Sequence, residues 1–318
     1  MQKLNKWLDS HMFLLVLVAL AIGFFVRLPD SPALKKVIVY LFAYMTFATS
    51  ITTSLGKFGR SLLKPWIPLW SLALIHIVTP AIVWGISAVI YPAETEVRLG
   101  YLVAAAIPIG VTSVVWTAMT KGDLNLSLAA VTLDAVATPV ILPLYFNVVI
   151  GQLVAINYWN LVIQLMLMVT LPSIIGMAIY DFTRGRSAPL GEGIGATLSK
   201  LAFFIVILIN SSVISPQLSW NLALFKMAVV TFLMSLTGYA AGYLGAFILR
   251  DRTPGMTLTM IYNVGLRNIS FGLVIALTYF PPASAIPIML LILYQQPLAA
   301  VIPKVLQRWD PRFRGKTA

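Results

Sequence analysis

Long apolar runs separated by short polar breaks are the dominant pattern along this chain. A membrane-crossing helix needs about 20 predominantly apolar residues, and ten runs approach or exceed that length. Short polar, Gly or Pro connections separate them, except for a longer polar stretch from Asp181 to Lys200. We therefore predict an all-α membrane protein with ten transmembrane helices. The expected spans are residues 11–28, 35–56, 65–91, 98–120, 124–151, 158–181, 196–215, 221–250, 254–279 and 283–307.

The order of the spans predicts an inverted repeat. Five spans precede the Asp181–Lys200 stretch and five follow it, so the two halves, about 11–151 and 158–307, must cross the membrane with opposite polarity. By sequence, residues 1–182 hold the first repeat and span 6, and residues 183–318 hold spans 7–10.

The fourth span of each repeat is interrupted. Ile107–Ser113 reads Ile-Pro-Ile-Gly-Val-Thr-Ser in span 4, and Asn263–Asn268 reads Asn-Val-Gly-Leu-Arg-Asn in span 9. Matching broken segments in two halves are the best sequence indication of a secondary-transporter binding site. The alternative is two independent Pro or Gly kinks.

Composition agrees with a membrane protein. Hydrophobic residues make up 59% of the chain, charged residues 10%, and the mean hydropathy is +0.91, whereas soluble domains carry about 25% charged residues. The first apolar run, Met12–Val26, lacks a small-residue cleavage site and reads as a first anchor. The chain has no cysteine, which excludes disulfides and thiolate metal sites, and we expect no metal centre and no cofactor.

The net charge of +12 is a topology signal. With the N-terminus inside, sixteen Lys and Arg residues fall on the inner side and four on the outer side. This bias predicts that both termini are cytoplasmic. It also explains the basic charge without nucleic-acid binding.

Two opposite charges are predicted to lie deep in the membrane. Arg267 sits in the span 9 break, and Asp134 lies about ten residues, or roughly 15 Å, into span 5. Helical spacing places Ser127, Val131, Asp134 and Thr138 on one face. We expect Asp134 and Arg267 to form an ion pair or to face one cavity, although a permanent pair that only joins two helices is the alternative.

The remaining intramembrane polar groups are less specific. His76 in span 3 is a candidate proton relay, but a lone histidine is more often a packed, hydrogen-bonded residue. Gln295 and Gln296 in span 10 are more typical of contacts between helices than of ligands.

Several segments resemble the bile acid:sodium symporter family. The similarity is carried by Leu99–Thr117, by Thr120–Leu128, and by the Asn263–Asn268 motif, in the order of that family. The resemblance implies a panel domain of spans 1, 2, 6 and 7 and a core domain of spans 3–5 and 8–10, with spans 4 and 9 crossing at their breaks. It also implies alternating access for an organic anion, such as a bile acid or a small carboxylate like pantoate, and a bacterial inner or plasma membrane location.

This chain departs from that family where sodium is bound. By resemblance, Asn263 and Arg267 replace a glutamate and a glutamine, and only Ser113 and Ser127 are retained. A hard cation prefers oxygen ligands including carboxylate, and a guanidinium nearby would repel it. The sodium-ligand positions that carry other residues are Ile75, Val114 and Val131.

The sequence therefore predicts a secondary transporter of a small organic anion, with Arg267 in place of sodium. Main-chain N–H groups at the half-helix starts are expected to help receive a carboxylate. A sodium symporter with rearranged ligands is the alternative, coupling to protons through Asp134 is open, and a channel or membrane sensor is the alternative from another class. No metalloprotease motif or aspartate pair suggests an enzyme. The candidate substrate-binding residues are Thr112, Ser113, Asn263, Arg267 and Asn268, and the candidate ion-coupling residues are Asp134, Arg267, Ser127 and Asn263.

Overall fold

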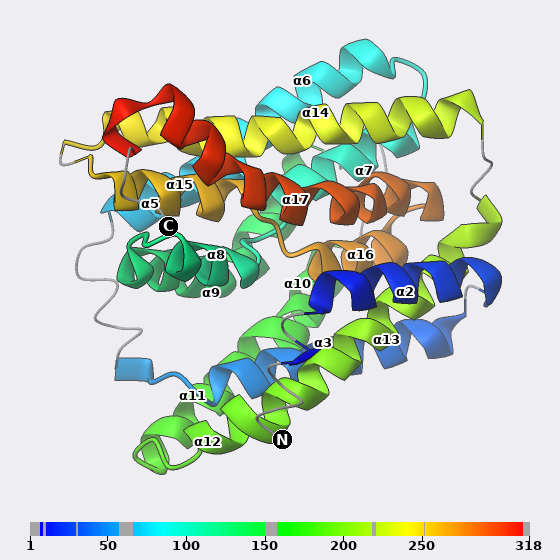
Figure 1. The fold of residues 1–318 in the computed structure, drawn as a ribbon. Coiled ribbons are helices and arrows are strands. Elements are labelled where there is room, and N and C mark those ends of the chain that lie inside the picture. Colours follow the sequence, from blue (N-terminus) through cyan, green and yellow to red (C-terminus); the bar gives the residue numbers. More distant parts are fainter. Residues whose placement is uncertain are drawn as a thin grey trace. The chain divides into compact units, whose positions relative to one another are not determined.

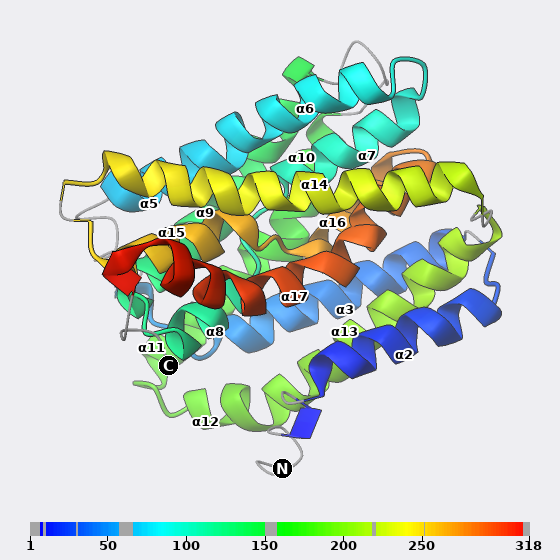
Figure 2. The same ribbon diagram turned by 45° about the horizontal axis from the view of Figure 1, so that its top comes forward.

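The described residues of the computed structural model are helical throughout, apart from turns and one isolated bridge (Figures 1 and 2). This confirms the predicted all-α class. The described residues are 7–8, 11–29, 31–56, 66–149, 158–217, 221–250 and 252–313. Both chain ends and the segment 57–64 are predicted to be cytoplasmic, and these residues lie outside the described ranges.

The chain divides into two compact units. One comprises Met1–Arg60, Pro139–Ser219 and Leu273–Pro282, and the other comprises Ser61–Thr138, Trp220–Gly272 and Ala283–Ala318. The chain passes from one unit to the other within helix α9 (Leu124–Val149) and within helix α16 (Ile269–Tyr279). The panel and core domains implied by the family resemblance stay a prediction.

The first unit is built around helix α13 (Ala196–Ile214). It packs against α2 (Met12–Phe25) and α3 (Pro32–Ser50), and Figures 1 and 2 show the three side by side. Helix α3 begins at a serine cap followed by a proline, and the Ser31 hydroxyl accepts the Leu34 N–H at 3.3 Å. Helices α10 (Tyr158–Leu165) and α11 (Leu171–Phe182) complete the unit.

The second unit holds both helix breaks. Its long helices are α14 (Leu222–Gly245) and α17 (Ala285–Trp309), and both contact α15 (Pro254–Gly265). All nine residues from Thr257 to Gly265 are buried, so α15 is enclosed on every side. The remaining helices are α5 (Trp66–Ala73), α6 (Thr79–Ile90), α7 (Thr95–Ala106) and α8 (Thr112–Met119).

Five helical stretches in the described residues are long and apolar enough to cross a membrane: Trp66–Ile90, Leu124–Val149, Ala188–Val213, Leu222–Ile248 and Pro282–Trp309. Two shorter apolar stretches are Met166–Phe182 and Ile269–Tyr279. Other predicted spans correspond to helices that are short or interrupted, such as α7 and α8 with 12 and 8 residues. The count of ten spans and the inverted repeat remain predictions.

The central polar stretch is more helical than the sequence suggested. Residues from Ala188 form α12 (Ala188–Leu190) and then a π-helical turn (Gly191–Gly195) that continues directly into α13. Helix α13 itself, Ala196–Ile214, has almost the predicted bounds of span 7, but the helical structure leading into it begins earlier, at Ala188. The glycines of the central stretch do not end the helix, and a π-helical turn runs through Gly191–Gly195.

A second π-helical turn, Leu74–Val78, interrupts span 3 between α5 and α6. Pro80 has no N–H to donate to the carbonyl of His76, four residues earlier, and its ring would clash with that carbonyl in a regular helix. The helix widens instead, and the Thr79 hydroxyl donates to the Leu74 carbonyl at 2.7 Å. Such π turns occur often at functional sites, and this one carries His76.

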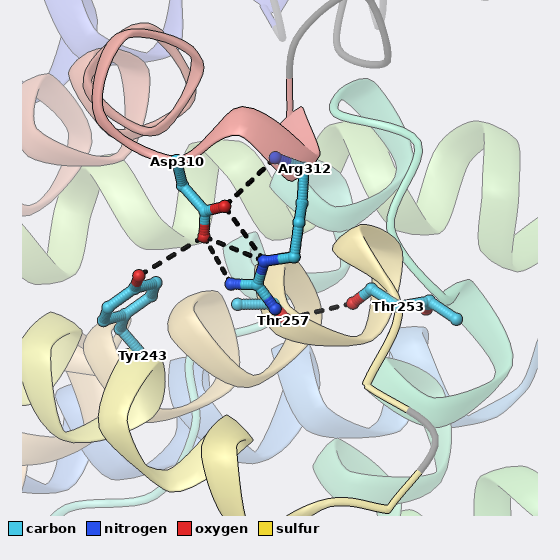
Figure 3. Close-up of polar contacts among 5 residues, drawn as sticks. All are labelled: Tyr243, Thr253, Thr257, Asp310 and Arg312. Atoms are coloured by element: carbon cyan, nitrogen blue, oxygen red, sulfur yellow. Dashed lines mark hydrogen bonds and ion pairs between the residues drawn. The ribbon is translucent and has the colours of Figure 1, made fainter.

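The end of α17 is fixed by an acidic group, as Figure 3 shows. The Asp310 carboxylate receives the Arg312 Nε–H at 2.9 Å and the Tyr243 hydroxyl at 3.3 Å. The Arg312 guanidinium also lies over the ring of Phe247, 5.9 Å from its centre. These contacts tie the residues after α17 to α14.

Candidate functional site

The two interrupted helices meet at their breaks. Ile107–Val111 separates α7 from α8, and Leu266–Asn268 separates α15 from α16. Ile109 and Arg267 form an isolated antiparallel bridge. Two main-chain hydrogen bonds of 2.8 Å flank it, from the N–H of Gly110 to the Leu266 carbonyl and from the N–H of Asn268 to the Pro108 carbonyl.

Glycine permits this close crossing. A Cβ atom on Gly110 would lie 2.8 Å from the main-chain oxygen of Arg267, and one on Gly265 would lie 2.2 Å from the Tyr239 ring. Real Cβ atoms do not approach other heavy atoms so closely. The glycines in both breaks therefore serve packing as well as chain flexibility.

Asp134 on α9 is held beside the crossing by two hydrogen-bond donors and by a close contact with His76. Its Oδ2 accepts the N–H of Ile109 at 2.6 Å, a group that the break in α7 leaves without a helical partner. Its Oδ1 lies 2.6 Å from His76 Nε2 and accepts the Thr138 hydroxyl at 3.3 Å. The side chain is fully buried, so the carboxylate serves as an internal cap for the broken helix.

His76 contacts two acceptors at once. Its Nδ1 is 3.0 Å from the Ala106 carbonyl at the end of α7, and its Nε2 faces the Asp134 carboxylate. The residue is 4% exposed. The histidine thus joins span 3 to spans 4 and 5.

Arg267 is buried with little hydrogen bonding. Its exposed fraction is 5%. Nη1 reaches the Ile107 carbonyl only at 3.5 Å, and Nη2 has no hydrogen-bond partner among the described residues. Its main chain is well held, because the Gln295 amide, oriented to satisfy both its atoms, accepts the Arg267 N–H at 2.8 Å and donates to its carbonyl at 3.2 Å.

A cavity of about 30 Å³ lies beside this guanidinium. Arg267 and Ser235 both line it, and the Ser235 hydroxyl also lacks a partner among the described residues. Two unsatisfied polar groups therefore border the same space. The volume suits one water-sized group. The other lining residues include Thr79, Tyr101, Thr231, Gly265, Leu291 and Gln295.

Two residues at positions that the family resemblance assigns to sodium binding, Ser127 and Asn263, contact each other. The Ser127 hydroxyl donates to Asn263 Oδ1 at 2.8 Å, and both residues are fully buried. Ser113 Oγ and Asn263 Nδ2 have no partner within the described structure. These three residues supply no carboxylate.

The other predicted residues are placed differently. Thr112 is exposed at the start of α8. Asn268 is half-buried, and its Oδ1 caps α16 by accepting the N–H of Phe271 at 3.2 Å. The main-chain N–H groups of Ile109, Gly110 and Asn268 all have partners within the protein. Fewer main-chain donors are therefore available for a carboxylate than the sequence suggested.

The expected ion pair between Asp134 and Arg267 is not formed. The two charges are close enough to interact electrostatically, but the Asp134 oxygens are occupied by His76, Ile109 and Thr138. Arg267 lines the cavity described above and Asp134 does not, so the other form of the hypothesis, in which both charges face one cavity, stays a prediction.

Two contributors were missed or undervalued in the sequence. Ser235 lies in an apolar helix with no motif around it, and no sequence signal singles it out. Gln295 was expected to bond between helices, and it does so with the main chain of Arg267. Only the three-dimensional register of α17 against the span 9 break gives it that place.

These features define a class: an integral membrane protein, all-helical in its described part, with two broken helices crossing at a buried guanidinium. The chain matches the family described as "Sodium Bile acid symporter family" over residues 38–234. It therefore belongs to that family, whose members are transporters rather than enzymes, and the resemblance found in the sequence is confirmed.

Two relatives from Bacillus subtilis (strain 168) are similar over most of their length. "Uncharacterized protein YbaS" is 33% identical over 272 residues, which cover 85% of this chain and 89% of the relative. "Uncharacterized sodium-dependent transporter YocS" is 22% identical over 258 residues, covering 80% of this chain and 78% of the relative.

Proposed function

We propose that this protein carries a small organic anion across the membrane by alternating access, without sodium, and that Arg267 is the positive charge that receives the anion. The observation that carries this proposal is the unpartnered guanidinium nitrogen of Arg267 beside the cavity. A buried charge costs several kcal/mol unless a partner meets it. An anionic group at the cavity would supply that partner.

The substrate class follows from the donors around the cavity. Arg267 offers a planar guanidinium suited to a carboxylate or a similar oxyanion, and the free Ser235 hydroxyl offers one more hydrogen bond. The remaining wall is largely apolar, with residues such as Val83, Met234 and Leu291. A carboxylate joined to an apolar body fits this combination.

Substrate entry requires opening of the site. A cavity of about 30 Å³ holds a water-sized group, whereas sites for drug-sized ligands run to about 300 Å³ or more. We infer that the structure corresponds to a closed arrangement. The helices that line the cavity must separate toward one side of the membrane for an organic anion to enter.

Sodium independence is supported by the chemistry of Ser113, Ser127 and Asn263. These residues offer neutral oxygens, and the Asn263 oxygen already accepts a hydrogen bond. The Asp134 carboxylate already contacts His76, the Ile109 N–H and the Thr138 hydroxyl. At an effective dielectric near 20, a guanidinium about 4 Å from sodium would oppose binding by ~4 kcal/mol.

The proposal is tested with purified protein. Thermal-shift screening of organic anions, including taurocholate and pantoate, identifies a ligand with and without sodium. Uptake of that ligand into proteoliposomes is then measured with sodium replaced by choline. We expect equal uptake in both salts and saturation at carrier-like rates. A steep sodium requirement would refute sodium independence, and ion-channel conductance in planar bilayers would refute the carrier.

A sodium-coupled symporter is the second candidate. It is favoured by the name of the relative YocS and by the unpartnered Ser113 hydroxyl. Under this alternative, Ser113→Ala would raise the sodium concentration needed for uptake, whereas sodium-independent transport leaves that variant without a sodium response.

A further inference from the structure

We propose that His76 and Asp134 hold one exchangeable proton between them, and that this proton is bound together with the anion and travels with it. The inference rests on the proposed anion site at Arg267. It makes the protein a proton–anion symporter in which the proton site and the anion site are separate groups that interact electrostatically.

The hydrogen-bond geometry requires a proton between the two side chains. A carbonyl oxygen can only accept, so His76 Nδ1, 3.0 Å from the Ala106 carbonyl, must carry a hydrogen. Nε2 lies 2.6 Å from Asp134 Oδ1. Without a proton there, a nitrogen lone pair would face a carboxylate oxygen at hydrogen-bond distance. The pair is therefore either imidazolium with carboxylate or imidazole with carboxylic acid.

Both forms of the pair have zero net charge. The Ile109 N–H and the Thr138 hydroxyl also donate to Asp134, and donors to a carboxylate favour its ionised form. We therefore assign the proton to His76 as imidazolium. When the proton leaves, Nε2 carries a lone pair and the His76 ring is neutral. Asp134 keeps its negative charge, so the net charge of the pair falls from zero to minus one.

Arg267 senses that change. The Asp134 carboxylate acts electrostatically on its guanidinium. With the pair protonated, the guanidinium is uncompensated and attracts an anion. With the pair deprotonated, the Asp134 charge offsets Arg267, and the attraction for an anion weakens.

Within the described part of the chain, no other titratable side chain forms a hydrogen bond or ion pair with His76 or Asp134. The segment from residue 66 to residue 90 has no charged side chain apart from His76, and the break of α7 contributes main-chain groups. Helix α14 contacts the π turn, but Lys226 binds the Ile90 carbonyl at 3.0 Å, and the Tyr239 hydroxyl donates to the Gln295 carbonyl at 2.7 Å.

Linkage then fixes the direction of coupling. Anything that favours the anion at Arg267 also favours the proton on the pair, and the effect is reciprocal. If one proton is taken up with each anion, the dissociation constant rises by up to about tenfold per pH unit once the pair has lost its proton. A proton taken from one side of the membrane is released on the other with the anion.

The first test observes the proton without a ligand. The chain contains two histidines, so the variant His11→Gln, labelled with ¹⁵N-histidine, reports on His76 alone. We expect both ring nitrogens of His76 to be protonated at low pH and Nε2 to lose its proton as pH rises. A His76 ring that stays neutral from pH 5 to pH 9, with an unprotonated Nε2, would overturn the proton site.

The second test measures coupling with taurocholate and pantoate as probe anions. We expect the dissociation constant of the bound probe to rise with pH in wild type and in His11→Gln, and to lose that dependence in His76→Gln. An inward-directed proton gradient should drive uptake in sodium-free vesicles. A pH-independent affinity, or uptake that ignores the gradient, overturns the coupling.

The two proposals can fail separately. If neither probe nor any other screened carboxylate binds at any pH, the anion site is refuted, while the ring nitrogens of His76 still report on the proton site. If an anion binds and is carried without pH dependence, the anion site stands and the proton coupling is lost. If His76→Gln does not fold, the nitrogen titration and the wild-type pH dependence decide the question.

Discussion

Among the residues at the crossing, Arg267 constrains the function of this protein most, because its guanidinium is charged and buried. Placing a charge at the depth of a membrane centre costs about 2.5 to more than 10 kcal/mol, and here the exposed fraction of the residue is 5%. Its main chain is held by Gln295 and by the bridge to Ile109, while its side chain is left almost unbonded. The chain fixes the position of the charge and leaves the charged group available.

Replacing Arg267 by lysine tests direct contact with the anion. Lysine keeps the charge but loses the planar pair of donors, so we expect about a tenfold or greater rise in the dissociation constant of the bound anion, equivalent to ~1.4 kcal/mol. Isothermal titration of the purified variant measures it. Arg252→Lys, at the start of α15 and away from the crossing, is the control and should bind as wild type. Equal affinity in both variants would argue that Arg267 does not touch substrate.

Also at the residue scale, the sequence identified the buried charged residues but did not identify their contact partners. Asp134 and Arg267 were recognised because charges inside an apolar span are costly. The partner of Asp134 is His76, 58 residues away in the chain. His76 lies in a π turn, and regular helical spacing does not predict the direction of a side chain there.

At the scale of the helical elements, the pattern of apolar and polar residues predicts some helix breaks correctly and others wrongly. The breaks in spans 4 and 9 were recognised from Pro108, Gly110 and Gly265, because proline and glycine interrupt helices for steric reasons. The stretch around Gly191 was taken for a loop for the same reasons, yet it forms a π turn continuous with α13. Packing decides between these outcomes: a Cβ on Gly191 would lie 2.6 Å from methyl carbons of Ile51 and Thr52.

Gly110→Ala should weaken the crossing itself. The added Cβ would meet the carbonyl oxygen of Arg267 at 2.8 Å, and neither main chain can move without breaking the bridge. We expect a loss of about 2–4 kcal/mol of stability, measured as a lower midpoint in thermal unfolding, together with loss of anion binding. Gly85→Ala in α6 is the matched control, because nothing lies within 4 Å of its added Cβ. Equal midpoints for the two variants would show that the crossing is looser than described.

The end of α17 should respond to acid. The hydrogen-bonded Arg312 guanidinium lowers the pKa of Asp310 from its ordinary value to about 2. Because the folded pKa is the lower one, the stabilisation is present above about pH 4 and is lost as pH falls toward 2. We expect Asp310→Asn to unfold a few degrees below wild type at neutral pH and the difference to shrink below pH 4. A difference that stays constant down to pH 2 would contradict the ion pair.

At the scale of the whole molecule, composition determined the class directly. A chain with 59% hydrophobic residues and five long apolar helices belongs in a membrane. The apolar pattern did not predict the observed division into two units, because two of the boundaries between them fall inside α9 and α16. Hydropathy marks a continuous span at both places and contains no sign of a unit boundary.

The predicted orientation can be tested by chemical labelling. The chain has no cysteine, so single cysteines can be added without removing others. Ala93 and Glu192 are both exposed and are predicted to lie on opposite sides of the membrane. We expect a membrane-impermeant maleimide to label Ala93→Cys in intact cells, and Glu192→Cys only after permeabilisation. The reverse labelling would invert the topology.

The bridge between Ile109 and Arg267 also has a consequence for solvent access. Unwound segments normally exchange their amide hydrogens quickly, but Gly110 and Asn268 each donate a 2.8 Å bond to the opposite break. Their deuterium uptake should therefore be slow while the two segments remain joined. These two amides would report whether the paired breaks separate during turnover or stay together while the surrounding helices move.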